Sequence, residues 1–108
     1  MRLYVIGPVT GMPDDNREAF VGAVRDLWNA GYKADFPHLH VPSDAEWHDA
    51  MKISVAHMMQ ADGVAMLDGW RDSKGARLEY RIARELDMPA YHVGHWLGNA
   101  ARFLEGGE

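Results

Sequence analysis

The chain has 108 residues, of which 47% are hydrophobic, with no cysteine and a formal net charge of −5. This length predicts one domain over residues 1–108, and the lack of cysteine excludes disulfides and thiolate metal sites. The acidic balance argues against a nucleic-acid polymer as partner, and no apolar run approaches the roughly 20 residues of a membrane span. Because the first residues pass straight into a strand pattern without a signal peptide, we expect a cytoplasmic protein.

Strand and helix patterns alternate along the chain. In order they predict a strand over 3–6, a helix over 16–30, a strand over 32–36, a helix over 45–60, a strand over 63–67, a helix over 74–87, a strand over 89–93 and a helix over 96–104. The Gly-Gly-Glu tail that follows is expected to fray. This alternation predicts an α/β fold, a small doubly wound four-stranded parallel sheet in the order 2-1-3-4 with helices on both faces.

Local signals mark the ends of the first helix. Asp14, Asp15 or Asn16 can cap its start, and Gly31 is well placed to end it. Its apolar face is predicted to consist of Phe20, Ala23, Val24, Leu27 and Trp28.

Two loops are expected to meet at the carboxyl ends of the first and third strands, where ligands bind in such sheets. The first, over 7–13, is neither a dinucleotide fingerprint nor a P-loop, because the spacing of Gly7 and Gly11 is wrong and no Gly-Lys-Ser/Thr follows. In the second, Ser73 is placed as a helix cap, and Gly75 lets a ligand approach the backbone. The free N–H groups of that helical turn favour an anion such as phosphate.

Glu79 lies one turn further into the third helix, on the same stripe as Ile82 and Ala83 that should face the sheet. A carboxylate on an apolar stripe is costly unless something uses it. A structural alternative stays open: Glu79 lies at the edge of the stripe and pairs with a surface arginine, and Ser73 is an ordinary cap.

These segments together resemble a known family. The residues that carry the resemblance are Tyr4-Val5-Ile6-Gly7-Pro8-Val9-Thr10-Gly11-Met12-Pro13, Asn16-Arg17, Trp47, Met51, Ala61-Asp62-Gly63-Val64-Ala65-Met66-Leu67, Gly69-Trp70 and Ser73-Lys74-Gly75-Ala76-Arg77-Leu78-Glu79. The chain is similar to the nucleoside 2-deoxyribosyltransferase-like superfamily, in particular its short phage and bacterial branch of uncharacterised domains. The resemblance covers residues 1–93 and implies a Rossmann-like fold and a nucleotide or nucleoside as ligand.

The resemblance also implies roles for individual residues. Glu79 would be the nucleophile that attacks the anomeric carbon of the sugar, and Tyr4 would orient it by a hydrogen bond. The positions implied to bind the substrate and its phosphate are Gly7, Pro8, Thr10, Gly11, Asn16, Ser73 and Gly75. The transferase branch has an aspartate at the position of Ser73, so the serine favours a nucleoside 5′-monophosphate over a free nucleoside. Trp70 is expected either to stack on the base or to pack over its own loop.

One position departs from the family pattern. Family members carry an aspartate eight residues before the aspartate of the third strand, and here that position is Ser54. A hydroxyl cannot protonate a leaving base near neutral pH as a carboxylic acid can. Either His57 or Asp49 substitutes for it, or the chain binds its ligand without turning it over efficiently.

Three functions therefore remain open. The leading one is an enzyme of the N-glycosidase or deoxyribosyltransferase type, which cleaves or transfers the N-glycosidic bond of a (deoxy)nucleoside 5′-monophosphate through Glu79. The second is a non-catalytic protein that binds or sequesters nucleotides on the same fold. The third is an interaction protein without a small ligand.

No metal or other cofactor is expected, because His38, His40 and His48 lack dependable ligand spacing. The second helix carries an apolar stripe instead. It consists of Trp47, Met51, Val55, Met58 and Met59. The resembled superfamily forms dimers through helices near the active site, so we expect a symmetric homodimer with this helix in the interface.

Overall fold

Four parallel strands form the central sheet of the computed structural model, which describes residues 1–105. The strands are β1 (Arg2–Ile6), β2 (Lys33–Asp35), β3 (Gly63–Met66) and β4 (Ala90–His92). Their order is β2-β1-β3-β4, and every neighbouring pair is parallel. The sheet order and direction predicted from the sequence are confirmed. The Gly-Gly-Glu tail lies outside the described residues.

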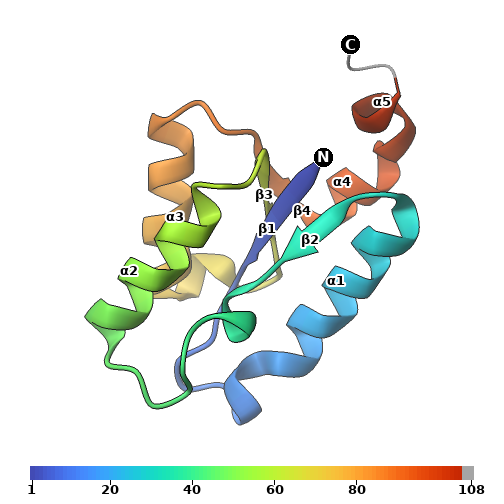
Figure 1. The fold of residues 1–108 in the computed structure, drawn as a ribbon. Helices are drawn as coiled ribbons and strands as arrows, with labels where there is room; N and C mark the ends of the chain where they lie inside the picture. Colours follow the sequence, from blue (N-terminus) through green and yellow to red (C-terminus); the bar gives the residue numbers. More distant parts are fainter. Residues whose placement is uncertain (106–108) are drawn as a thin grey trace.

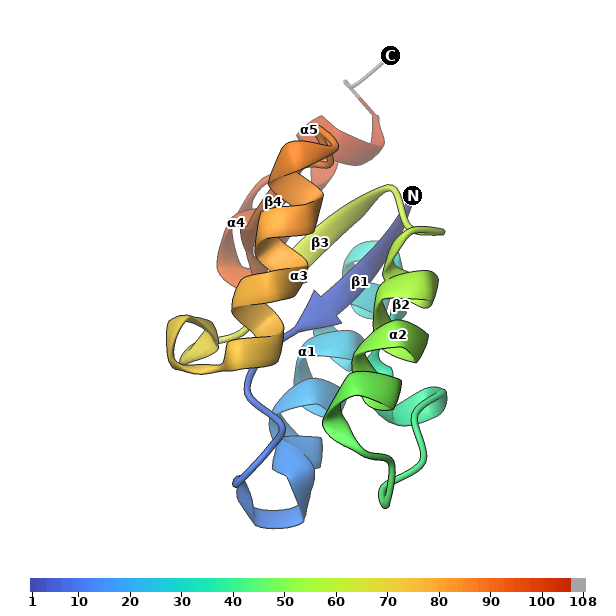
Figure 2. The same ribbon diagram turned by 90° about the vertical axis from the view of Figure 1, so that its left-hand side faces the viewer.

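Helices cover both faces of this sheet. They are α1 (Arg17–Ala30), α2 (Trp47–Met58), α3 (Lys74–Glu85), α4 (Val93–Gly98) and α5 (Ala100–Leu104), with 3-10 segments η1 (Pro13–Asn16), η2 (Pro37–Leu39) and η3 (Trp70–Asp72). Helices α2 and α3 lie on one side of the strands and α1 on the other (Figure 1, Figure 2). None of the helices in residues 1–105 is long and apolar enough to cross a membrane.

The alternation of side chains along β1 divides the interior into two cores. Leu3 and Val5 belong to the core beneath α1 and α4, whereas Tyr4 and Ile6 belong to the core beneath α2 and α3. All four side chains are fully buried, as expected for an inner strand of a parallel sheet covered on both faces. Tyr4 is the polar member of this set, and its hydroxyl needs a partner beneath α2 and α3.

The ends of α1 differ in how well the sequence predicts them. Gly31 ends the helix as predicted, in the left-handed conformation with a φ of 109°, and its N–H donates to the carbonyl oxygen of Trp28 at 3.0 Å. Asn16 occupies the cap position at the start, but its side chain makes no capping hydrogen bond. Trp28, predicted on the apolar face, is 53% exposed, and its indole N–H donates to the Ala34 carbonyl oxygen at 3.3 Å.

The predicted C-terminal helix over 96–104 is two helices, and the first begins earlier, at Val93. His92 caps α4 because its Nδ1 atom accepts a hydrogen bond from the Gly94 N–H. This cap also ends β4 one residue before the predicted boundary. Asn99 separates α4 from α5 with a φ of −121°, and its side-chain amide donates to the His95 carbonyl oxygen at 2.9 Å.

Candidate functional site

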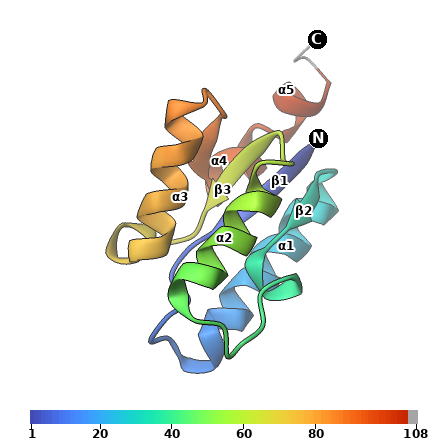
Figure 3. The ribbon, with the colours of Figure 1, turned by 60° about the vertical axis from the view of Figure 1, so that its left-hand side comes forward.

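A cavity of about 480 Å³ lies at the carboxyl ends of β1 and β2. Its walls come from the loop after β1, the loop after β2, one side of α2 and the beginning of α3. These segments gather at one end of the sheet, toward which the strands point (Figure 3). The volume is in the range of ordinary small-molecule sites, and open α/β sheets bind ligands at the carboxyl ends of their strands.

Glu79 lies in the wall of this cavity and is only 5% exposed. Together with Ala76 and Ala83 it makes up the buried stripe of α3, so the carboxylate faces inward, as its spacing predicts. No ion pair within the described residues involves Glu79. The structural alternative, an edge position paired with a surface arginine, is therefore not what this structure has.

A chain of hydrogen bonds holds the Glu79 carboxylate. The Ser54 hydroxyl donates to Oε2 of Glu79 at 2.6 Å, and the Tyr4 hydroxyl lies 2.7 Å from the Ser54 oxygen. Since Ser54 has a single proton and gives it to Glu79, Tyr4 must donate to Ser54. Burial raises the pKa of Tyr4, so its hydroxyl keeps the proton that this bond needs. Tyr4 thus positions Glu79 through Ser54 and not by the direct hydrogen bond expected.

Burial also controls the charge of Glu79. It raises the pKa of this carboxyl group from 4.5 to about 7, and the Ser54 hydrogen bond opposes part of that rise. A substantial fraction of Glu79 is consequently protonated near neutral pH. Carboxyl groups with such a pKa are common in active sites, where a group has to gain or lose charge during a reaction.

Ser73 caps α3 as predicted, accepting a hydrogen bond from the Ala76 N–H at 3.2 Å. Gly75 also lines the cavity, and a Cβ atom placed there would lie 3.0 Å from the Met51 sulfur. Any side chain at this position would therefore crowd the wall formed by α2. The first turn of α3 directs its free N–H groups toward the cavity end of the helix, which favours an anion.

The loop after β1 ends in a strained turn. Asp14, Asp15 and Asn16 all have positive φ values, of 49°, 54° and 60°. Asparagine and aspartate tolerate this left-handed backbone better than other side-chain-bearing residues. The Asn16 amide donates to the Pro8 carbonyl oxygen at 3.0 Å, and Nε2 of His38 lies 2.7 Å from the Asp15 carbonyl oxygen. Asn16 thus fixes the loop and does not cap α1, because its backbone is turned away from the capping geometry.

The structure brings most of the expected site residues to this cavity. Those that line it are Gly7, Thr10, Gly11, Ser73, Gly75 and Glu79. Pro8 and Asn16 bond to each other next to the cavity, and Tyr4 lies behind Ser54. Trp70 is not part of the lining: its ring packs on Tyr80 with centroids 4.6 Å apart. In this structure the ring therefore packs against α3, and stacking on a base stays a prediction.

Other cavity residues have no counterpart in the sequence-based site. Asp15, Arg17, His38 and Trp47 all line it. The predicted strand order could have indicated His38 as a site residue. Because β2 neighbours β1 in that order, the residues after β2 must reach the same edge of the sheet. Ser54 also lines the cavity. The expected substitutes for it as proton donor, His57 and Asp49, do not.

Comparison with known proteins identifies a family that the chain matches. The chain matches a domain of unknown function, DUF4406, over residues 1–92. This match spans all four strands, helices α1 to α3 and both glycine-containing loops of the cavity. Neither a curated protein nor a solved structure matches the chain. Since the match covers most of the chain, the chain belongs to the DUF4406 family of domains.

Proposed function

We propose that this protein cleaves or transfers the N-glycosidic bond of a (deoxy)nucleoside 5′-monophosphate, with Glu79 as the nucleophile. The observation that supports this most is a buried carboxylate, held by Ser54, in the wall of a nucleotide-sized cavity. The same cavity includes the capped start of α3 and the loop after β1.

In the proposed reaction, the ionised Glu79 attacks the anomeric carbon of the sugar and forms an ester bond. The bond from that carbon to the base nitrogen breaks, and the base leaves with the electron pair and takes up a proton. Water or a second base then attacks the same carbon and releases Glu79. Tyr4 and Ser54 hold the carboxylate in place and favour its charged form by hydrogen bonding.

The cavity also suits a 5′-phosphate. Ser73 and Gly75 place the first turn of α3 at its wall, and Arg17 is a cationic side chain in the lining. Backbone N–H groups at a helix start and a guanidinium are the groups that bind phosphate oxygens in proteins. Asp15 is the other carboxyl group in the described lining, and we assign it as the proton donor to the leaving base.

The direct test is to incubate the protein with a panel of nucleoside and deoxynucleoside monophosphates and to measure released base by chromatography. We expect Glu79→Gln, which keeps the size and the Ser54 contact, to lower the rate by a factor of about 100 or more. Glu85→Gln is the matched control, because Glu85 is an exposed carboxylate on the same helix. Base release that survives in Glu79→Gln contradicts the proposed role.

A second candidate function is nucleotide binding without turnover, and Ser54 is the observation that favours it. Its hydroxyl occupies the place where the resembled family has an acid, and it contacts Glu79 at 2.6 Å. Calorimetry separates the two functions: binding of a monophosphate without base release, in both the natural chain and Ser54→Asp, supports the binding protein. If no monophosphate binds or raises the melting temperature, both functions are wrong, because a ligand of the folded state must stabilise it.

A further inference from the structure

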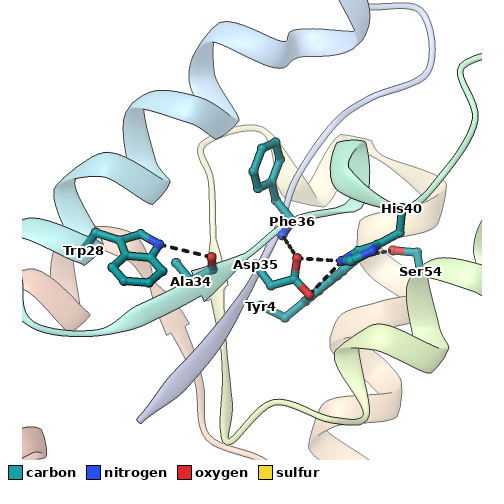
Figure 4. A network of polar contacts seen from close by, with 7 residues as sticks. All are labelled: Tyr4, Trp28, Ala34, Asp35, Phe36, His40 and Ser54. Atoms are coloured by element: carbon teal, nitrogen blue, oxygen red, sulfur yellow. Dashed lines mark hydrogen bonds and ion pairs between the residues drawn. The ribbon is translucent and has the colours of Figure 1, made fainter.

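A second cluster of polar side chains lies apart from the cavity lining. It consists of Asp35 at the end of β2, His40 after η2 and His57 in the last turn of α2. One ligand atom from each residue lies within 4.8 Å of the other two. Figure 4 shows the Asp35 carboxylate between the backbone N–H of Phe36 and the His40 ring. The spacing of the histidines in the sequence does not reveal this group, because α2 contributes the third member.

The Asp35 carboxylate is buried and has few partners. It is 9% exposed, accepts a hydrogen bond from the Phe36 N–H at 2.9 Å, and lies 2.7 and 2.9 Å from Nε2 of His40. No lysine or arginine in residues 1–105 forms an ion pair with it. Buried carboxylates are commonly paired with a cation or bound to a metal ion, and among the described residues His40 is the one side chain that hydrogen-bonds to Asp35.

The imidazole rings of His40 and His57 lie against each other. The His40 and His57 rings stack with centroids 3.4 Å apart and an angle of 8° between their planes. The hydrogen bonds within the described part of the chain include none to the His57 ring. A ring nitrogen of His57 is therefore available as a ligand.

We propose that Asp35, His40 and His57 bind a divalent transition-metal ion, and that Zn²⁺ suits them best. Two imidazole nitrogens and one carboxylate oxygen are a ligand set that Zn²⁺ accepts, with water as the fourth ligand. Magnesium and calcium prefer oxygen ligands and are disfavoured by the imidazoles. The Phe36 N–H already holds one oxygen of Asp35, as an outer-shell donor does around bound metals.

Binding requires a small rearrangement of one ring. Ligand atoms around a tetrahedral zinc ion lie about 3.4 Å apart. The ligand atoms of Asp35, His40 and His57 lie within 4.8 Å of one another, and this upper distance is longer than the spacing around zinc. Stacked rings also direct their nitrogens side by side, so the His57 ring has to tilt toward the ion. His57 is only partly buried and can do so, whereas His40 and Asp35 already contact each other.

The proposed metal has a structural role. None of its three ligands lines the cavity, although Asp35 lies opposite Tyr4 in the register of β1 and β2. The ion would tie the end of β2 and the loop after it to α2. That loop carries His38, which lines the cavity, so the metal stiffens one cavity wall. This inference is independent of the proposed reaction.

The experiment is a titration of the full, untagged chain with Zn²⁺ against a chromophoric chelator, and with Co²⁺ followed by visible absorption. We expect one ion per chain, the absorption of a low-coordinate Co²⁺ site, and no competition from Mg²⁺. His57→Ala and Asp35→Asn should weaken Zn²⁺ binding by a factor of about 100 or more. His48→Ala is the matched control, because His48 lies on the same helix with a side chain 74% exposed.

Two further readouts keep the test decisive. Circular dichroism establishes that each variant is folded, and Zn²⁺ should raise the melting temperature of the natural chain and of His48→Ala but not of His57→Ala. If the natural chain does not bind Zn²⁺, the proposal is wrong. It is equally wrong if His57→Ala and Asp35→Asn bind Zn²⁺ as tightly as His48→Ala.

Discussion

Glu79 is unusual because a buried carboxylate is held here by hydroxyl groups and not by a cation. Ser54 gives it one hydrogen bond, and Tyr4 supports Ser54 from β1. Burial raises the pKa of Glu79 to about 7, and hydroxyl donors oppose that rise less than an arginine would. The residue that departs from the resembled family, Ser54, is also the residue that positions the candidate nucleophile.

This raised pKa predicts a pH dependence of stability. Because the folded chain binds a proton at Glu79 more tightly than the unfolded chain does, stability falls as the pH rises from about 4.5 to about 7. Glu79→Gln removes this pH-dependent contribution to stability, because glutamine does not ionise. Relative to the variant, the natural chain should lose on the order of 3 kcal/mol of unfolding free energy across that range.

Urea denaturation of both proteins at about pH 5 and about pH 8 measures the difference. Glu85→Gln serves as the control, since Glu85 is exposed and should follow the natural chain. If the free-energy difference between the natural chain and Glu79→Gln is the same at both pH values, then burial does not raise the pKa of Glu79.

At the scale of elements, the beginning of α3 combines a helix cap with part of the candidate site. The Ser73 oxygen accepts from the Ala76 N–H, and Ser73 also lines the cavity. The residue therefore has two roles that different substitutions separate. An aspartate caps a helix as well as a serine does, but it brings a negative charge to the place proposed for the phosphate.

We expect Ser73→Ala to lower the unfolding free energy by about 1 kcal/mol, and Ser73→Asp to leave it nearly unchanged. Ser73→Asp should nevertheless weaken binding of nucleoside monophosphates by a factor of about 10 or more, with little effect on free nucleosides. Denaturation and calorimetry measure the two effects. Equal loss of affinity for both ligands in Ser73→Asp would place the phosphate elsewhere.

For the whole molecule, the surface of α2 bears on assembly. Met58 is fully buried in the core beneath α2 and α3, so it cannot belong to the apolar surface expected to form a dimer. Met59 is 47% exposed, and Met51 and Trp47 are partly exposed at the cavity. An interface over this helix would bring the neighbouring chain next to the candidate site.

We therefore retain the homodimer as a proposal with a revised interface, in which Met59 takes part. Light scattering at micromolar concentration should give about twice the chain mass of 12.1 kDa. Met59→Lys should shift the protein toward the monomer, because it buries an unpaired charge in the interface. Leu86→Lys is the control, since Leu86 is 52% exposed but lies at the end of α3. A monomer in the natural chain contradicts this assembly.

The sequence by itself determined those features that depend on neighbours along the chain. Alternating apolar patterns predicted the parallel sheet and its order, and the caps Gly31 and Ser73 were predicted from residue type. The stripe of α3 placed Glu79 inward for the same reason. Boundaries failed where one side chain decided them, as His92 does at the start of α4.

Only the tertiary structure decided which side chains meet. Ser54 and Glu79 are 25 positions apart and lie on different helices, so their contact depends on how α2 is rotated over the sheet. The same rotation brings His57 to the His40 ring and to Asp35. Helical periodicity tells which residues share a face, but the partner of that face is determined by packing between elements distant in sequence.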